Sequence, residues 1–173
     1  MGLKESGLRG SLRNVSVGID EIPDDWLYDR GAGEDDFDVS FSQGEGTAEK
    51  RDESLFARVP GDASGQEERL WSSVEKVDLS DFNSIRFRST GQTFDDLSTF
   101  WLAVDSTDAN QRAFDWDENV KAEEGVNDWT ERDDSIDVSG LSGEYFVGFA
   151  VEDPSGSSSN EIEIDVFEIE LVD

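Results

Sequence analysis

The sequence contains no cysteine and no histidine among its 173 residues. Without cysteine there is neither a disulfide bond nor a thiolate to act as nucleophile or metal ligand. Without histidine the chain lacks the side chain that most often serves as a general base or binds a metal. Catalysis by a Ser-His-Asp or Cys-His arrangement is therefore impossible. Paired carboxylates remain, but a close pair among 43 acidic residues is uninformative, and we predict that the protein is not an enzyme.

Positive charge is also scarce. Lysine and arginine total 14 against 43 aspartate and glutamate residues, which gives a formal net charge of −29. Most of these cations are arginine, and the lysines are Lys4, Lys50, Lys76 and Lys121. So much like charge destabilises a compact fold at ordinary ionic strength, whereas molar salt shortens the Debye length to about 3 Å and screens the repulsion. The composition is typical of a halophile's protein, from a haloarchaeon or a virus of such a host.

The alternative interpretation of this composition is an acidic disordered protein. Five tryptophans and eleven phenylalanines argue against disorder, because they supply enough apolar surface for a core. A surface this negative repels phosphate, so we expect no binding to nucleic acid. No apolar run approaches the roughly 20 residues of a membrane span, and the N-terminus lacks the apolar segment of a secretory signal. We therefore predict no membrane insertion, and extracellular display would need another route, such as assembly into a particle.

Sustained helical periodicity is absent as well, and residues 117–126 allow one helical turn at most. From residue 35 onward, short apolar or alternating segments are separated by Gly, Ser, Asp and Pro, which is the pattern of antiparallel strands. Strands are expected at 37–41, 54–59, 70–74, 77–79, 85–88, 100–104, 135–138, 145–151 and 162–171. The apolar phase slips by one residue between Val166 and Phe167, which predicts a β-bulge. The predicted fold is an all-β antiparallel β-sandwich, a jelly roll, over residues 35–173.

Residues 1–34 differ from the rest of the chain. Glycines at positions 2, 7, 10 and 18 interrupt any regular element. We predict an extended N-terminal arm that docks on a neighbouring subunit through Leu3, Leu8, Leu12, Arg9 and Arg13. The alternative is a free terminus without a docking role.

Three stretches of the sequence carry a family resemblance. Residues 77–87, 134–143 and 144–151 read VDLSDFNSIRF, DSIDVSGLSG and EYFVGFAV. In this order they resemble galactose-binding-like and carbohydrate-binding jelly rolls, in which a V-D-L-S strand pair precedes a late I-D-V-S hairpin. Such modules recur in tail, fibre and appendage proteins of tailed viruses and in secreted glycosidases. The resemblance covers residues 35–173 and implies an architecture rather than a ligand.

Two tryptophans lie in acidic segments and are candidates for an exposed platform on which a sugar ring stacks. The candidate glycan-binding residues are Trp116, Trp129, Arg112, Asp115, Asp117 and Asp128. The aspartates would accept hydrogen bonds from sugar hydroxyls, and the arginine would donate them. The alternative is that each tryptophan caps one end of the sandwich core. Trp101, by contrast, lies in an apolar segment typical of a buried central strand, so we expect it in the core.

An oxygen-rich turn follows the segment 100–104. Its candidate metal ligands are Asp105, Asp108 and Asn110. Carboxylate and carbonyl oxygens suit calcium, and jelly rolls of the resembled class often carry one structural calcium ion. The turn lacks the spacing of an EF-hand loop, and the alternative is a solvated acidic loop. No cofactor is required by any other pattern in the chain.

These observations favour a structural protein of a halophilic tailed virus, a subunit of the tail, the baseplate or a capsid-surface appendage. We expect a homo-oligomer, because such appendages follow cyclic symmetry, with other virion proteins and host glycans as partners. It would be assembled in the host cytoplasm and located in the virion. The alternative is a haloarchaeal cell-surface or secreted carbohydrate-binding module. A third class, an assembly protein without a ligand, stays open.

Overall fold

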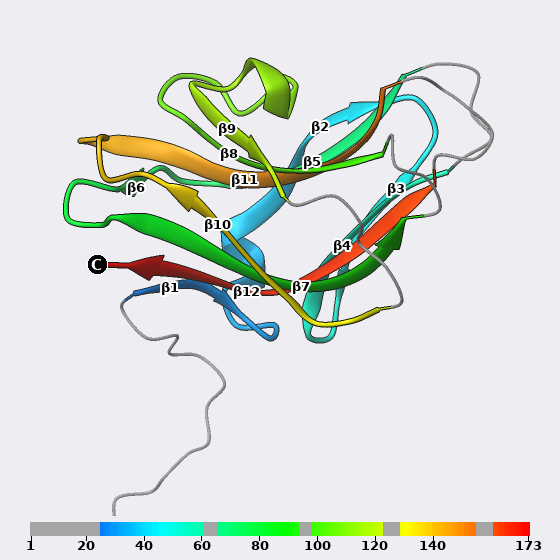
Figure 1. Cartoon of the computed structure of the whole chain (residues 1–173), viewed down its shortest axis with the longest axis horizontal. Helices are drawn as coiled ribbons and strands as arrows, with labels where there is room; N and C mark the ends of the chain where they lie inside the picture. The colour runs from blue at the N-terminus through cyan, green and yellow to red at the C-terminus, as the bar shows by residue number, and fades with distance from the viewer. Residues whose placement is uncertain (1–24, 61–65, 94–97, 123–128, 155–160) are drawn as a thin grey trace, which may run out of the picture.

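The computed structural model describes residues 25–60, 66–93, 98–122, 129–154 and 161–173. These residues form two antiparallel sheets that pack face to face as two layers (Figure 1). Sheet A has the strand order β10 (Arg132–Asp137), β7 (Ser84–Thr93), β12 (Ile162–Val172), β4 (Ser54–Val59) and β3 (Thr47–Arg51), with β1 (Trp26–Asp29) also pairing with β12. Sheet B has the order β2 (Phe37–Gln43), β5 (Glu67–Ser73), β11 (Glu144–Asp153), β8 (Thr99–Asp105) and β9 (Glu118–Lys121), with β6 (Val77–Asp78) also pairing with β11. The predicted all-β antiparallel sandwich is confirmed.

Each predicted strand segment overlaps an observed strand, because the apolar pattern matches the burial. Along β7, buried and half-exposed side chains alternate from Ser84 to Gly91. Strand β8 is buried on both faces, as its continuous apolar sequence predicted. The predicted bulge is also confirmed, since the pairing of β12 with β7 shifts register between Val166 and Glu168.

Three strands were not predicted from the sequence. Strand β3 has the sequence TAEKR and is mostly exposed at the edge of sheet A, so it has no apolar alternation to detect. Strand β9 lies where one helical turn was allowed, and pairs with β8 so that Val120 lies opposite Leu102. The third is β1. In each case backbone pairing with a neighbour, rather than a side-chain pattern, makes the segment a strand.

The position of β1 moves the start of the sandwich ahead of residue 35. Tyr28 is fully buried and its ring contacts Phe37 edge to face, with ring centroids 6.2 Å apart. The backbone N–H of Arg30 donates to the carbonyl of Phe167 at 2.8 Å. Residues 25–34 are therefore part of the folded domain rather than of an arm. The predicted docking residues Leu3, Leu8, Leu12, Arg9 and Arg13 lie outside the described residues.

The main core lies between the two sheets. Phe149 of β11 belongs to it and makes edge-to-face contacts with Phe87 of β7 and Phe100 of β8. Trp71 of β5 is 2% exposed, and its indole N–H donates to the carbonyl of Phe56 at 2.9 Å. Each such buried aromatic side chain contributes about 1.5–3 kcal/mol through its removal from water. This core fixes the two sheets relative to each other and leaves their outer faces for other uses.

Candidate functional site

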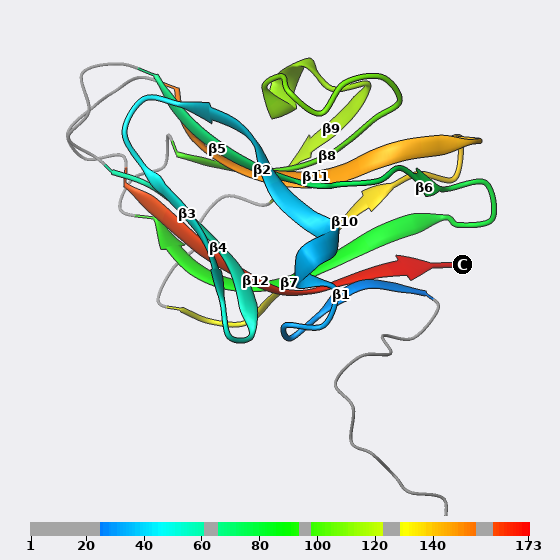
Figure 2. The same cartoon turned by 180° about the vertical axis from the view of Figure 1, so that it is seen from behind.

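The outer face of sheet B is covered in part by the chain between β8 and β9. This segment, residues 106–117, is here named the β8–β9 loop and contains a short 3-10 helix, η2 (Ala113–Asp115). Both views place it on the side of sheet B that faces away from sheet A (Figure 1, Figure 2). A second apolar cluster lies beneath it, formed by Leu70, Trp101, Ala103, Ala109, Ala113, Trp116 and Ala150. The loop is thus a packed part of the molecule.

Trp116 belongs to this second cluster. Its side chain is 3% exposed, and its indole N–H donates to the carbonyl of Gln111 at 3.2 Å. The ring lies directly over Gly148 of β11, where an added Cβ would come within 2.8 Å of Cη2. The prediction that Trp116 forms an exposed platform is therefore wrong. Gly148 has no side chain, so the indole packs directly against the strand at that position. Trp101 is buried, as predicted, and it lies in the same outer cluster.

Trp129 lies elsewhere. It is 41% exposed, and its backbone N–H donates to the carbonyl of Gly91 in β7, which places it beside sheet A. Trp116 belongs to the outer face of sheet B, so the two tryptophans do not form one surface. Asp128 lies outside the described residues.

Arg112 ties the β8–β9 loop to the sheet. Its guanidinium Nε lies 3.1 Å from Glu68 Oε2, and its Nη2 donates to Glu152. Glu68 of β5 and Glu152 of β11 are register partners and are 1% and 4% exposed. Trp101 donates its indole N–H to Glu152 at 2.6 Å, and the backbone N–H of Ala113 donates to Glu68 at 2.8 Å. Burial raises the pKa of Glu68, and the N–H of Ala113 and the Arg112 guanidinium oppose that shift. Arg112 is thus committed to holding the loop rather than to a ligand.

The two predicted aspartates of the loop have different environments. Asp117 accepts hydrogen bonds on Oδ2 from the backbone N–H and the hydroxyl of Ser106, at 2.8 and 2.5 Å. Asp115 is exposed in η2, and its backbone N–H closes the turn onto the carbonyl of Arg112 at 2.9 Å. Asp117 is therefore a structural residue of the loop, while Asp115 faces solvent.

Asp105, the first predicted calcium ligand, organises the start of the loop. Its Oδ1 accepts the backbone N–H groups of Thr107 and Asp108 at 2.7 and 2.8 Å, and its Oδ2 accepts Gln111 Nε2 and the backbone N–H of Asp117 at 2.9 and 3.1 Å. Burial alone raises the pKa of Asp105, but these donors outweigh it and hold the pKa below its usual value. A calcium ion here would have to displace them. Among the described residues no group of three or more His, Cys, Asp or Glu side chains is arranged to hold a metal ion.

A cleft of about 400 Å³ lies beside the loop on the outer face of sheet B. We call it the sheet B cleft. Its floor comes from β2, β5 and β11, and its wall from the loop; the lining residues are Asp38, Val39, Ser40, Ser72, Ser73, Val74, Thr107, Asp108, Ala109, Asn110 and Phe146. Asp108 and Asn110, predicted as metal ligands, therefore lie at the wall of a cleft. Sequence reasoning missed the cleft itself, although the polar pair Ser72-Ser73 between Trp71 and Val74 was a signal for it.

Several oxygen atoms of the cleft have unused hydrogen-bonding capacity. Asp38 Oδ1 accepts the backbone N–H of Val39 at 2.8 Å, and Asp108 Oδ1 accepts that of Asn110 at 2.7 Å. Within the described part of the chain, Oδ2 of each aspartate receives no hydrogen bond. Ser40, at the register shift of β2, has a buried hydroxyl without a partner in the described structure. Buried polar groups are normally hydrogen-bonded, so an unpartnered hydroxyl in a cleft indicates a place for a polar ligand or water.

One end of the cleft lies near Lys76, on the turn between β5 and β6. Its Nζ donates to the carbonyl of Ser106 at 2.6 Å and lies 5.3 Å from the ring centroid of Phe146. Lys76 therefore joins the β5–β6 turn to the β8–β9 loop, and it contacts the one aromatic side chain that lines the cleft.

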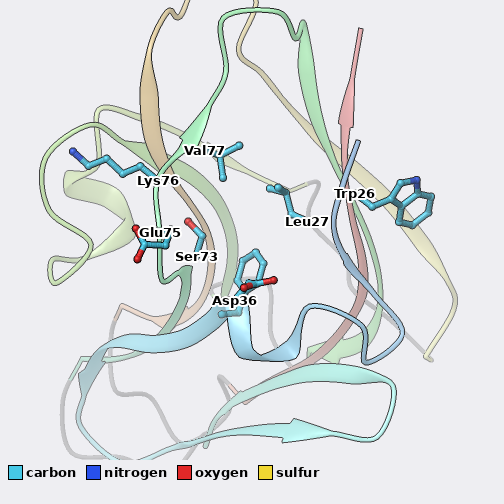
Figure 3. A pocket seen from close by; sticks show the side chains of 8 residues that line it. Trp26, Leu27, Asp36, Ser73, Glu75, Lys76 and Val77 are labelled. Carbon is cyan, nitrogen blue, oxygen red and sulfur yellow. The ribbon is translucent and has the colours of Figure 1, made fainter. Parts of the chain in front are cut away.

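A second pocket opens between the sheets at the β1 end of the sandwich (Figure 3). It has a volume of about 170 Å³, and Leu27 of β1 and Val77 of β6 point into it. Sites for small molecules usually have about 300–1,000 Å³, so this pocket is small for a ligand, whereas the sheet B cleft lies inside that range.

The comparisons with known proteins identify a fold class. Neither the protein-family models nor the curated proteins give a match. Among solved structures, a promiscuous carbohydrate-binding module of the β-sandwich superfamily matches with a TM-score of 0.52 and 12% identity, over 87% of this chain and 62% of that chain. A family 29 carbohydrate-binding module from Piromyces equi matches at a TM-score of 0.47 and 14% identity, over 86% and 89% of the two chains. The match with a TM-score of 0.52 shows a β-sandwich fold that this chain shares with that carbohydrate-binding module.

A larger protein also matches. The glycoside hydrolase domain of Endo-D from Streptococcus pneumoniae R6 has a TM-score of 0.49 and 14% identity, over 79% of this chain and 21% of that chain. The chain thus spans about a fifth of the length of this protein.

In the described ranges no helix is long and apolar enough to cross a membrane.

Proposed function

We propose that this chain is a non-catalytic glycan-binding β-sandwich that holds carbohydrate in the sheet B cleft. The observation that supports this function is the combination of unused oxygen acceptors on Asp38 and Asp108 with the ring of Phe146 in one cleft. The fold shared with carbohydrate-binding modules is consistent with it, although fold alone does not define a ligand.

The chemistry of the cleft suits a molecule rich in hydroxyl groups. An ionised carboxylate only accepts hydrogen bonds, and a hydroxyl that donates to it forms a stronger bond than one between neutral groups. Asn110 both donates and accepts, so it matches the mixed character of a sugar edge. Phe146 adds an apolar surface for the C–H face of a ring. Together these groups give orientation and apolar contact, the two requirements of a small-molecule site.

The proposal that the protein is non-catalytic also has a structural reason. Glu68 and Glu152 form a close pair of carboxylates, the kind of pair that glycoside hydrolysis requires. Both are buried beneath the β8–β9 loop and bound by Arg112, so a substrate in the cleft does not reach them.

Glycan binding is tested with an array of neutral oligosaccharides, followed by titration calorimetry on the strongest ligand. Replacing Phe146 with alanine is expected to weaken binding by about tenfold or more, since a stacking aromatic contributes about 0.5–1.5 kcal/mol beyond its buried area. Phe114→Ala is the matched control, because Phe114 is 59% exposed on the loop and does not line the cleft. Asn110→Ala is a second cleft variant that spares the apolar cluster. Equal affinities for all four proteins, or no retained glycan, would refute the proposal.

A role as a homo-oligomeric subunit of a halophilic virus particle is a second proposal. It is supported by the net charge of −29 and by the apolar and basic residues of the N-terminal segment. We expect light scattering to show an oligomer for the full chain and a monomer for a variant that starts at Asp25, which keeps β1. We also expect thermal stability to rise from dilute buffer to molar NaCl, because salt screens the carboxylates. A monomeric full chain would exclude the subunit role, and salt-independent stability would exclude the halophilic environment.

A further inference from the structure

The charged residues that line the sheet B cleft are both acidic. Asp38 and Asp108 line it from different elements, one on β2 and one on the β8–β9 loop, and none of the lining residues is lysine or arginine. Both aspartates are exposed residues. The chain around them has a net charge of −29, which adds a negative potential of long range.

The nearby cations Lys76 and Arg112 do not line the cleft, and each has partners elsewhere in the fold. Lys76 donates to the carbonyl of Ser106 and contacts the ring of Phe146. Arg112 is held by Glu68 and Glu152 beneath the loop. A carboxylate or sulfate group on a ligand would need a free Arg, Lys or cluster of backbone N–H groups for recognition. The described lining of the cleft contains neither arginine nor lysine.

We infer that the sheet B cleft selects neutral glycans and rejects anionic ones, such as uronates and sulfated sugars, and that Asp38 and Asp108 are the residues that determine this selection. The inference rests on the proposed glycan-binding function. A sugar hydroxyl has a proton to donate to Asp38 Oδ2 and Asp108 Oδ2, whereas a sugar carboxylate at the same place has none. Like charges brought together at an interface cost several kcal/mol, and a partly enclosed cleft screens them less than bulk water does.

The geometry explains why both aspartates contribute. Asp38 lies opposite Ser72 in the pairing of β2 with β5, on the floor of the cleft. Asp108 is fixed by the backbone N–H of Asn110, so its carboxylate keeps its place at the wall. A ligand that fills the cleft therefore contacts Asp38 on the floor and Asp108 on the wall. An anionic group on that ligand would lie near one of these two carboxylates.

The experiment uses matched ligands on the full chain. The probes are gluco-, manno- and galacto-oligosaccharides with β-1,4 linkages, each compared with its C6-oxidised uronate form and with the methyl ester of that form. Affinities are measured by calorimetry at the lowest NaCl concentration at which far-UV circular dichroism shows the folded state, because salt screens the repulsion. We expect the uronate to bind at least about tenfold more weakly than the neutral glycan, and the methyl ester to recover most of the loss.

Variants of Asp38 and Asp108 test whether the weaker binding of uronates arises in the cleft. Asp38→Asn and Asp108→Asn remove one charge each and keep the oxygen that accepts the neighbouring N–H, so folding is preserved. Each is expected to improve uronate binding by about five- to tenfold, the effect of one unit charge near a protein surface. Glu53→Gln is the control, since it removes one exposed charge from the turn between β3 and β4.

The possible outcomes distinguish a failure of the charge-selection inference from a failure of the proposed glycan-binding function. If no oligosaccharide binds, the proposed function itself fails and the inference fails with it. If neutral and uronate forms bind equally, or the methyl ester binds as weakly as the uronate, the protein is a glycan binder without charge selection and the inference is wrong. If Glu53→Gln improves uronate binding as much as the cleft variants do, the general charge of the chain, rather than Asp38 and Asp108, is responsible.

Discussion

The outer faces of the two sheets accommodate the excess of acidic residues in different ways. On sheet A, most of the ion pairs between arginines and carboxylates remain partly open to solvent: Arg86 pairs with Asp133 and Glu170, and Arg88 with Glu131. The second partner of Arg88, Glu168, is buried. On sheet B, a single arginine holds two buried carboxylates beneath a loop. Surface ion pairs contribute little one at a time, whereas a buried pair that loses its partner leaves an uncompensated charge. The same chemistry thus has a small energetic role on one face and a large one on the other.

The largest expected effect comes from removing the arginine of the sheet B face. Arg112→Ala leaves Glu68 and Glu152 buried side by side without their cation, so we expect a loss of about 3–5 kcal/mol in the free energy of unfolding. The β8–β9 loop should also detach, which exposes Trp116. Urea denaturation measures the first effect and a red shift of tryptophan fluorescence measures the second. A loss below about 1 kcal/mol would show that the buried network does not hold the loop.

A smaller loss is expected where Trp116 rests on sheet B. In Gly148→Ala the new Cβ would lie 2.5 Å from the carbonyl oxygen of Trp71 and 2.8 Å from Trp116 Cη2. Overpacking of this kind costs about 1–3 kcal/mol. Gly140→Ala is the matched control, because no atom lies within 4 Å of its added Cβ, and it should change stability by less than about 0.5 kcal/mol. Thermal melts of the two variants test this prediction. Equal melting temperatures for Gly148→Ala and Gly140→Ala would contradict it.

On the sheet A face the expected loss is smaller still. Arg86→Ala removes pairs with Asp133 and Glu170, both on partly exposed side chains, so the cost should be below about 1 kcal/mol. Molar NaCl should abolish this cost through screening, whereas the cost of Arg112→Ala should persist. Urea denaturation at two salt concentrations tests the difference. If both variants respond to salt alike, the contrast between the faces fails.

The two faces should also respond to pH with opposite sign. Burial raises the pKa of Glu68, so the folded state binds its proton more tightly, and its contribution to stability increases as the pH falls through the folded-state pKa. The hydrogen bond from Arg86 lowers the pKa of Asp133, so the contribution of Asp133 is present above the unfolded-state pKa and is lost as the pH falls through the folded-state pKa. Denaturant unfolding of Glu68→Gln and Asp133→Asn against the wild type, between neutral and acidic pH, should show these opposite slopes. Parallel slopes would contradict the assignment.

Much of the fold was predictable because strand burial is local in sequence. Alternation predicted β7, continuous apolar runs predicted β8 and β11, and the phase slip at Val166 predicted the bulge in β12. Edge strands such as β3 carry no such pattern, since one side of an edge strand pairs and the rest faces water.

The candidate site was predicted less well. Acidic neighbours suggested that Trp116 was exposed, but its burial depends on Gly148, more than thirty positions along the chain. Arg112 was expected to bind a ligand, yet its partners Glu68 and Glu152 come from two other strands. The oxygen-rich turn at 105–110 was recognised from its polar side chains, but its position at the wall of a cleft was not predicted. No local pattern distinguishes these alternatives.

The sequence by itself determined that this protein is an acidic all-β chain without cysteine or histidine, because composition and the two-residue period of strands are properties of neighbouring residues. Only the tertiary structure decided which face of which sheet carries a cleft, which tryptophan is buried and which arginine is bound. Those outcomes depend on side chains that meet across strands from distant parts of the chain. Gly148 allows Trp116 to be buried, and the buried carboxylates of Glu68 and Glu152 bind Arg112.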